Sequence, residues 1–293
     1  MLKKISLMLA VVILPFLVLI FYFIPAFRGD IAVVSGFHIG PVLVRFYGIL
    51  IAAAIWACYA IALRLASRFG FTANQIENAL PWLVIFGLAG ARLYYAIFSW
   101  DDFQDHPWQI LQIWKGGLSI YGGLAGAALG LAIYAKRSGI HFAKIFDLAA
   151  VTLPLGQAIG RFGNFFNQEA FGTPTTLPWG MYVEPQFRPF EYLFVQSFHP
   201  AFLYESVWNL FVFFLLVYLV RTGISASAGR LAGTYLILYS IGRYFIESLR
   251  VDSFFMHSFR VDQITAQVMM IAGAIILFIS YHAQRSKQTA QIN

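Results

Sequence analysis

A polar stretch, Gly160-Arg161-Phe162-Gly163-Asn164-Phe165-Phe166-Asn167-Gln168-Glu169-Ala170-Phe171-Gly172, lies in the middle of a chain that is 60% hydrophobic and only 11% charged. Polar side chains are costly at membrane depth, so they usually face a cavity, a partner or a substrate. An arginine with two carboxamides and a carboxylate nearby can bind a phosphate and orient the ester attached to it. The stretch predicts a polar site inside a membrane protein; the alternative is a polar loop between two membrane helices.

The composition of the whole chain indicates a polytopic membrane protein. Soluble domains average about 25% charged residues, well above the share in these 293 residues. The net charge of +7 does not indicate nucleic-acid binding, because the basic residues stand at the ends of apolar runs, as the positive-inside rule requires. Cys58 is the single cysteine and lies inside an apolar run, so we interpret it as a packing residue.

Eight apolar runs are each long enough to cross a bilayer, which takes about 20 residues. They cover residues 5–27, 41–65, 79–100, 116–135, 144–160, 200–220, 231–249 and 261–282. Lys3 and Lys4 precede the first run, and basic residues follow every second run, so both termini are predicted to lie in the cytoplasm. The first run is also compatible with a cleaved signal peptide, but it is long for one and no clear small-x-small cleavage site follows it.

The segment 161–198 is the longest polar part of the chain. It contains Pro174, Pro178, Pro185 and Pro189, which argue against a continuous helix. We expect a small cap outside the membrane there, built from short strands or turns. The predicted fold class is therefore an all-α polytopic membrane protein. No internal repeat is visible, so the inverted-repeat architecture of many transporters has no support.

Several polar residues lie inside the predicted spans, where exposure to lipid would be costly. Tyr239, Arg243, Glu247 and Arg250 stand at positions i, i+4, i+8 and i+11, which places them on one face of a helix. Such a face inside a span is expected to meet protein or water rather than lipid. The alternative for Arg243 and Glu247 is a structural ion pair that ties helices together.

The run at 116–135 is rich in glycine. Gly122, Gly126 and Gly130 form a row of small residues that allows two helices to approach closely. Tyr121 precedes this row, and its hydroxyl is placed to reach a cavity. A tyrosine that anchors the chain at the membrane interface is the alternative.

Two further residues stand out. Arg92 lies inside a predicted span, and His199 precedes a proline at the head of another. A hydrogen-bonded interface residue is the alternative to a functional role for His199. No group of His, Cys, Asp or Glu has metal-ligand spacing, and no glycine-rich nucleotide loop follows a strand. We therefore expect no metal and no cofactor.

Taken in order, these motifs resemble those of the bacterial prolipoprotein diacylglyceryl transferases. Residues 160–172 look like the family motif Gly-Arg-x-Gly-Asn-Phe-x-Asn-x-Glu-x-x-Gly. The resemblance extends to Phe46-Tyr47-Gly48, Gly90-Ala91-Arg92, the Gly-Gly-Leu-Ser-Ile-Tyr-Gly-Gly-Leu segment, His199-Pro200 with Tyr204-Glu205, and Tyr239 through Arg250. It covers about residues 38–285, and an ordered set of this size is specific.

The resemblance implies an enzyme that moves the sn-1,2-diacylglyceryl group of phosphatidylglycerol to the lipobox cysteine thiol in a prolipoprotein signal peptide. A thioether forms and glycerol phosphate leaves. The implied catalytic residues are Arg161, Arg243, Tyr121 and Tyr239. The implied substrate-binding residues are Tyr47, Arg92, Asn164, Asn167, Glu169, Glu205, Glu247, Arg250 and His199. A membrane transporter or lipid flippase with an arginine-lined anion path is the alternative function.

The implied chemistry makes two physical demands. The leaving phosphodiester gains negative charge, which preorganised guanidinium groups stabilise. The thiol must lose its proton, and nearby cations lower the pKa of a cysteine from about 8.5. We expect Arg161 and Arg243 to meet both demands, by stabilising the leaving phosphodiester and by lowering the thiol pKa. Tyr121 and Tyr239 are expected to orient the reacting groups or to relay the proton. The resemblance places such an enzyme in the bacterial inner membrane, among membrane lipids, with its site towards the outer leaflet.

The sequence departs from the family pattern in three places. Tyr121 stands where many members have a histidine that has been proposed as the base, and Gln168 replaces a usual glycine, which is expected to stiffen the turn. The first run is extra relative to a seven-span family core. The expected organisation is an additional membrane helix at 1–28, a transferase domain at 38–285 with the cap at 161–198 inserted, and a cytoplasmic tail at 286–293.

Overall fold

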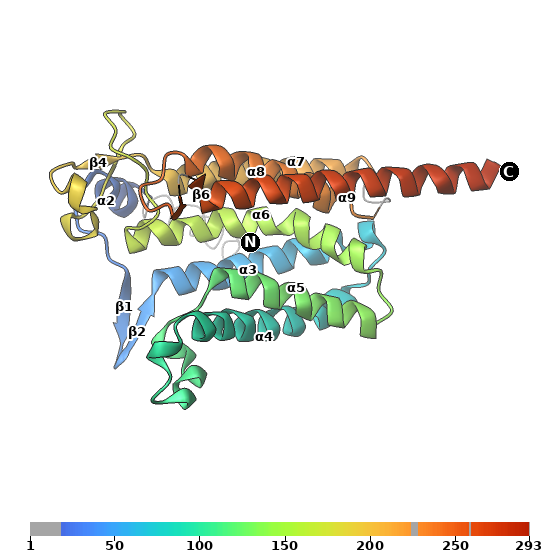
Figure 1. The fold of residues 1–293 in the computed structure, drawn as a ribbon, viewed down its shortest axis with the longest axis horizontal. Helices are drawn as coiled ribbons and strands as arrows, with labels where there is room; N and C mark the ends of the chain where they lie inside the picture. Colours follow the sequence, from blue (N-terminus) through green and yellow to red (C-terminus); the bar gives the residue numbers. More distant parts are fainter. Residues whose placement is uncertain (1–18, 224–227, 258, 293) are drawn as a thin grey trace, which may run out of the picture. The chain divides into compact units, whose positions relative to one another are not determined.

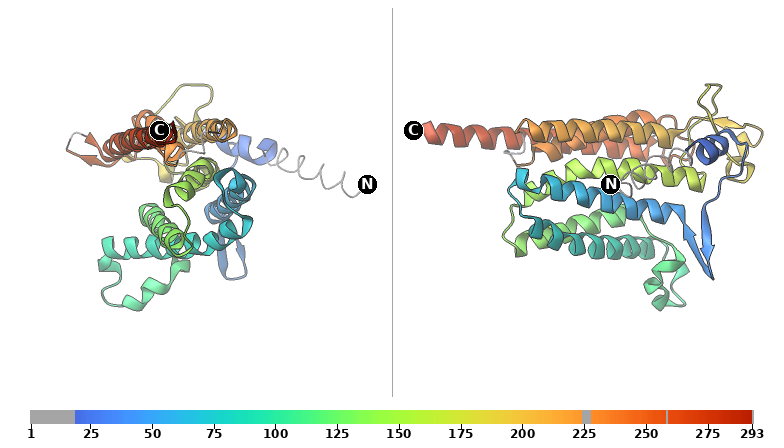
Figure 2. Two further views of the ribbon diagram at one scale, coloured as in Figure 1. Left: turned by 90° about the vertical axis from the view of Figure 1, so that its right-hand side faces the viewer. Right: turned by 180° about the vertical axis from the view of Figure 1, so that it is seen from behind.

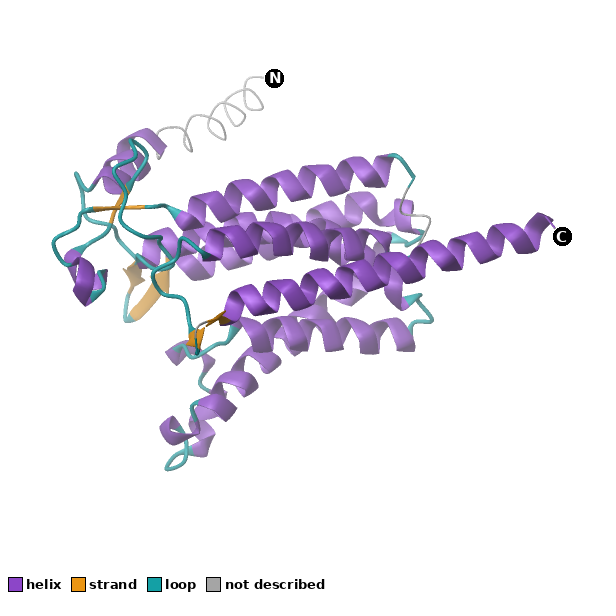
Figure 3. Cartoon of the chain, turned by 45° about the horizontal axis from the view of Figure 1, so that its top comes forward, coloured by secondary structure: helices purple, strands orange, loops and turns teal. Residues whose placement is uncertain are grey.

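The computed structural model describes residues 19–223, 228–257 and 259–292, and most of them are helical (Figure 1). The α-helices are α2 (Ile24–Arg28), α3 (Phe46–Leu65), α4 (Ala73–Phe98), α5 (Ile120–Arg137), α6 (Phe142–Asn167), α7 (Ala201–Arg221), α8 (Arg230–Glu247) and α9 (Val261–Ile292). The strands are short: β1 (Gly36–Ile39), β2 (Val42–Arg45), β3 (Met181–Tyr182), β4 (Ser197–Phe198), β5 (Phe255–Met256) and β6 (Phe259–Arg260). They pair as β1–β2, β3–β4 and β5–β6, all antiparallel (Figure 3).

Five helices in the described part of the chain are long and apolar enough to cross a membrane. They are Phe46–Phe69, Ala73–Phe98, Phe142–Asn167, Ala201–Arg221 and Val261–Arg285, and each matches a predicted run. The runs predicted at 116–135 and 231–249 form α5 and α8, which are helical but are not among these five. The run at 5–27 lies mostly outside the described residues. The all-α polytopic class is confirmed.

Helix α6 differs from the prediction at its end. It continues through Asn167, seven residues beyond the predicted limit, so the first part of the segment expected to form the cap is helical. Glycine and asparagine disfavour helices, but tertiary packing outweighs propensity when a helix buries an apolar face. The helix stops where Gln168 and Ala170 take φ angles of 52° and 56°, in the left-handed region. The expected strands and turns follow from there.

The chain divides into two compact units. Within the residues that the structure describes, the first comprises 19–55, Pro154–Val212 and the described part of 236–271, and the second Trp56–Leu153, the described part of 213–235 and 272–292. The core of the first unit is largely aromatic, and it explains why α6 extends so far. Phe165 is fully buried, with its ring centroid 4.6 Å from that of Phe23 and 5.7 Å from that of Phe202. The other buried members of this core are Ala26, Phe171, Met181, Val183 and Phe198.

The second unit is built around the packing of α4 on α5, which lie side by side (Figure 2). Gly90 of α4 faces Gly122 and Gly126 of α5 so closely that a Cβ atom on any of them would overlap the opposite backbone. The predicted row of small residues therefore does serve helix packing.

Asp147 fixes the start of α8 within the second unit. This carboxylate is fully buried on α6. Its two oxygens accept hydrogen bonds from the backbone N–H groups of Gly229 and Ala232, each at 2.7 Å. The first N–H groups of a helix lack partners within the helix and favour negative charge. Asp147 supplies that cap from a different helix.

Candidate active site

Two arginines that are far apart in the sequence share one buried carboxylate in the first unit. Glu205, near the start of α7, is 3% exposed. Its Oε2 atom pairs with Nη2 of Arg161 on α6, and its Oε1 atom lies 3.0 Å from Nη1 of Arg243 on α8. Burying ions is costly unless they are paired, so these three helices are held together by their charged groups.

Arg243 pairs with two further carboxylates besides Glu205. Its Nη2 atom lies 2.7 Å from Oε2 of Glu247 and 2.7 Å from Oδ2 of Asp262 at the start of α9. The side chain is 11% exposed. Carboxylates on two sides fix the plane of the guanidinium group, which is the preorganisation that charge stabilisation in catalysis needs.

Arg250 joins the cluster in a way that the helical spacing did not predict. The prediction that it shares one helix face with Arg243 is wrong, because α8 ends at Glu247. Instead Arg250 forms a backbone bridge with Gly172, and its guanidinium lies 3.6 Å from Glu205 and 2.7 Å from Asp252. Helix termination and a strand-like bridge thus replace the continuous helix.

The carboxylates beside Arg250 stabilise its charged form. Burial by itself would lower its pKa, but the hydrogen bond to Asp252 and the nearby carboxylate of Glu205 raise the pKa above its usual value. Arg260, on β6, holds the same turn: its Nη1 atom donates to the carbonyl oxygens of Glu247 and Arg250 and to Oγ of Ser253. Arg260 therefore fixes the conformation of the turn after α8, and this turn positions Arg250 in the site.

The polar stretch contributes a second, smaller group. Asn164 and Asn167 both donate from Nδ2 to Oε1 of Glu169, at 3.1 and 3.0 Å. Gly163 lies against the ring of Tyr47 on α3, where a Cβ atom would overlap the ring. Four of the predicted site residues thus meet at the end of α6.

Gln168 has a clear structural role. Its side chain is buried, its Nε2 donates to the carbonyl of Phe165 and its Oε1 accepts from the backbone N–H of Glu184. Gln168 therefore ties the end of α6 to the segment before β4.

His199 lies in a hydrogen-bonded group at the head of α7. Its Nδ1 atom is 3.1 Å from the hydroxyl of Tyr204, which accepts a hydrogen bond of 2.8 Å from Nε1 of Trp179. Its backbone pairs with that of Gly172 and Thr173. These contacts match the structural alternative for His199, and a substrate-binding role stays a prediction.

Arg92 and Tyr121 belong to the second unit. Arg92 is 6% exposed and donates to five backbone carbonyls between α4 and α5, those of Gln109, Ile110, Gln112, Gly116 and Gly117, at 2.6 to 3.4 Å. A guanidinium has five N–H groups, so Arg92 holds this segment together, and its role in substrate binding stays a prediction. Tyr121 is 59% exposed, and its ring centroid is 6.5 Å from that of Tyr94.

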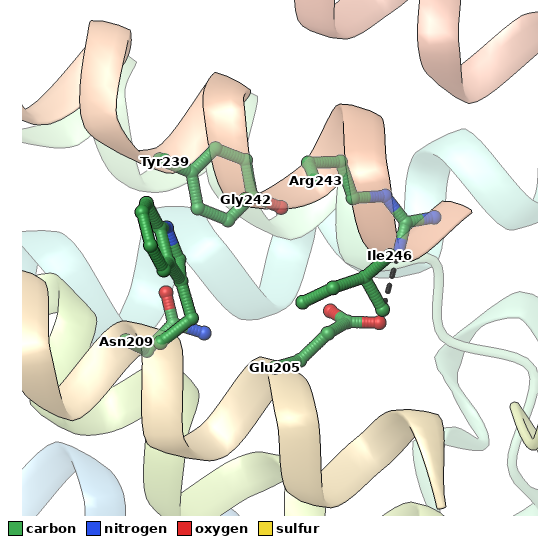
Figure 4. Close-up of a pocket in the computed structure, with 7 residues that line it drawn as sticks. Glu205, Asn209, Tyr239, Gly242, Arg243 and Ile246 are labelled. Carbon is green, nitrogen blue, oxygen red and sulfur yellow. Dashed lines mark hydrogen bonds and ion pairs between the residues drawn. The ribbon is translucent and has the colours of Figure 1, made fainter. Parts of the chain in front are cut away.

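A small pocket lies beside the Glu205 cluster, between α7 and α8 (Figure 4). It is lined by Glu205, Trp208, Asn209, Tyr239, Gly242, Arg243 and Ile246. Sequence reasoning missed Asn209, Asp262 and Arg260. Asn209 carries a recognisable signal, because it is a polar residue four positions after Glu205 in an apolar run.

The chain is similar to one family along most of its length. The family description "Prolipoprotein diacylglyceryl transferase" matches residues 35–279. A phosphatidylglycerol–prolipoprotein diacylglyceryl transferase of Synechococcus elongatus is 43% identical over 253 residues, covering 85% of this chain and 88% of the relative. Relatives with the same name from Fervidobacterium nodosum and Thermosynechococcus vestitus are 41% and 42% identical, covering 93% and 84% of this chain and 94% and 91% of their own lengths.

Proposed function

Because the chain belongs to the prolipoprotein diacylglyceryl transferase family, we propose that it transfers the sn-1,2-diacylglyceryl group of phosphatidylglycerol to the lipobox cysteine of prolipoproteins. The product is a thioether, and glycerol phosphate is released. This is the first step of bacterial lipoprotein maturation. The observation that carries the assignment to this site is the convergence of Arg161 and Arg243 on Glu205. Because the family and the relatives are named as transferases, the alternative of a membrane transporter or lipid flippase is not favoured.

In this reaction the thiolate sulfur attacks the carbon of the diacylglyceryl group that is bonded to the phosphate oxygen. A sulfur–carbon bond forms, the carbon–oxygen bond breaks, and the electron pair leaves on the phosphate oxygen. Arg161 and Arg243 stabilise the negative charge that develops on the leaving phosphate. The phosphate competes with the carboxylate of Glu205 for these two guanidinium groups. The proton of the thiol leaves to solvent or to a neighbouring group. The same cations lower the thiol pKa, so Tyr239 and Tyr121 are assigned an orienting role.

The other predicted residues divide between headgroup and scaffold. Asn164, Asn167 and Glu169 form a compact set of donors and acceptors at the end of α6, suited to a phosphoglycerol headgroup. Tyr47 supports this set by packing on Gly163. Glu247 and Arg250 keep Arg243 and Glu205 in place.

The protein is a multi-pass membrane protein with bacterial relatives. Its location in the inner membrane, with the site near the outer leaflet, is part of the proposal. Within α6, Lys144 lies near the start and Arg161 near the end; within α7, Glu205 lies near the start and Arg221 at the end. Lysine and arginine at span ends prefer the cytoplasmic side, which puts the opposite, site-bearing ends outside.

The deciding experiment incubates purified protein with phosphatidylglycerol micelles and a lipobox peptide, and detects the thioether by mass spectrometry. Arg161→Ala and Arg243→Ala are each expected to lower the rate by about 10²–10³, the usual effect of losing one charge-stabilising donor. Arg64→Ala, at an exposed arginine at the end of α3, is the matched control and keeps the rate. Normal transfer by both site variants would refute the assigned roles.

A further inference from the structure

Asn209 is a buried polar residue that the fold does not explain. It lies on α7, four positions beyond Glu205, and is 2% exposed. Its Oδ1 atom has no hydrogen-bond partner among the residues that the structure describes. Buried polar atoms are nearly always paired, and leaving one unpaired costs stability. An unpaired acceptor at a site lined by charged residues therefore points to a ligand.

The pocket into which Asn209 faces has rigid walls. Trp208 donates from Nε1 to the carbonyl of Leu238 at 2.9 Å, and its indole lies so close to Gly242 that a Cβ there would overlap it. Tyr239 and Arg243 face Asn209 and Glu205 from α8 (Figure 4). The space that remains holds about one water-sized group. The occupant is thus a small polar group, and an acyl chain does not fit.

The acceptor chemistry narrows the occupant further. A carbonyl oxygen accepts hydrogen bonds and cannot bind a phosphate oxygen, which is also an acceptor. The phosphate belongs on the guanidinium of Arg243, which lines the pocket, so the small space itself receives only the group that pairs with Asn209. The occupant must therefore donate a hydrogen bond to Oδ1 and be linked to that phosphate by only a few covalent bonds. A hydroxyl of the headgroup glycerol meets both conditions.

We propose that Asn209 is a specificity-determining residue, whose Oδ1 atom accepts a hydrogen bond from a headgroup hydroxyl while Arg243 holds the adjoining phosphate. This inference rests on the proposed transferase function. It assigns recognition of the glycerol headgroup to α7, outside the polar stretch on α6. A lipid that lacks the headgroup hydroxyls leaves Oδ1 unpaired and reacts more slowly.

The test compares two lipid donors in the thioether assay: phosphatidylglycerol and phosphatidylpropanol, which lacks both headgroup hydroxyls. The wild-type protein is expected to prefer phosphatidylglycerol by about five- to tenfold in kcat/KM, the value of one buried hydrogen bond. Asn209→Ala and the milder Asn209→Ser lose this preference, because they slow only the reaction of phosphatidylglycerol. Ser240→Ala is the matched control. Ser240 is also buried, and its hydroxyl has no hydrogen-bond partner in the described part of the chain, but it does not line the pocket, so the preference stays.

Three outcomes overturn the proposal. Equal losses with both lipids would show that Asn209 only supports the fold. A wild-type protein that uses both lipids equally well would contradict it whether or not the variants fold. A wild-type protein that forms no thioether from either lipid would refute the transferase function itself, which is a separate and recognisable result.

Discussion

Glu205 is the residue on which the charged cluster depends. It contacts Arg161, Arg243 and Arg250, which come from α6, α8 and the turn after α8. These cations lie close to one another in a largely buried position, and their mutual repulsion is offset only by the carboxylates among them. A buried charge left without its partner destabilises a protein far more than the intact pair stabilises it.

Replacing Glu205 by alanine is therefore expected to lower the free energy of unfolding by about 3–5 kcal/mol, the usual cost of breaking a buried ion pair. Glu205→Gln keeps the shape and one acceptor, so the loss is smaller. Glu77→Ala, at an exposed glutamate of α4, is the matched control with unchanged stability. Denaturant or thermal unfolding in detergent measures the difference. An alanine variant as stable as the wild type would show that the cluster does not hold the helices together.

At the residue scale, the sequence identified Arg243 and Glu247 by their charge inside an apolar run and Arg161 by its place in the polar stretch 160–172. Glu205 was identified through the family resemblance. The sequence did not identify Asp262, because an acidic residue near the start of a span is usually taken as solvated. It misplaced Arg250, because spacing shows which residues share a helix face only while the helix lasts. The spacing contains no signal for the bridge between Gly172 and Arg250.

Among the elements, α4 and α5 depend on glycine more than on side-chain complementarity. A Cβ at Gly126 would overlap the backbone carbonyl of Phe86 and the Cα of Gly90. Because backbone cannot move aside as a flexible side chain does, substitution there must push the two helices apart.

We expect Gly126→Ala to cost about 1–3 kcal/mol of stability through overpacking. The matched control is Gly48→Ala on α3, where the added Cβ meets open space and removal of a helical glycine stabilises by about 0.5–1 kcal/mol. The opposite signs of the two changes, measured by unfolding in the same detergent, are the test. A stabilising Gly126→Ala would show that the helices are more loosely packed than described.

Helix α8 is held at its start by a residue that the sequence analysis did not single out. Asp147→Ala removes the acceptor for the N–H groups of Gly229 and Ala232, and it is expected to cost about 1–3 kcal/mol for each buried donor left unpaired. Asp147→Asn keeps one oxygen and is expected to retain part of the stability. Hydrogen exchange of the first turn of α8 locates the effect. Unchanged protection there in the alanine variant would contradict the capping role.

On the scale of the whole molecule, the arrangement of basic residues predicts the topology. Fluorescent-protein fusions at residue 285 and enzymatic reporters inserted at residue 187 test it, because the first folds in the cytoplasm and a periplasmic phosphatase is active only outside. We expect fluorescence from the first and phosphatase activity from the second. The reverse pattern would invert the orientation and place the site at the inner leaflet.

The fold class and five of the eight spans could be predicted from the sequence, because hydropathy and length are local properties that a bilayer acts on directly. The motif residues were recognisable for a similar reason: a charged side chain in an apolar run is costly unless it faces a partner or a cavity, whatever the tertiary fold. The extension of α6, the placement of Arg250 and the pairing of Asp147 with α8 were not predictable. Each depends on contacts between segments distant in sequence, where burial of aromatic rings and pairing of charges outweigh local helix preference.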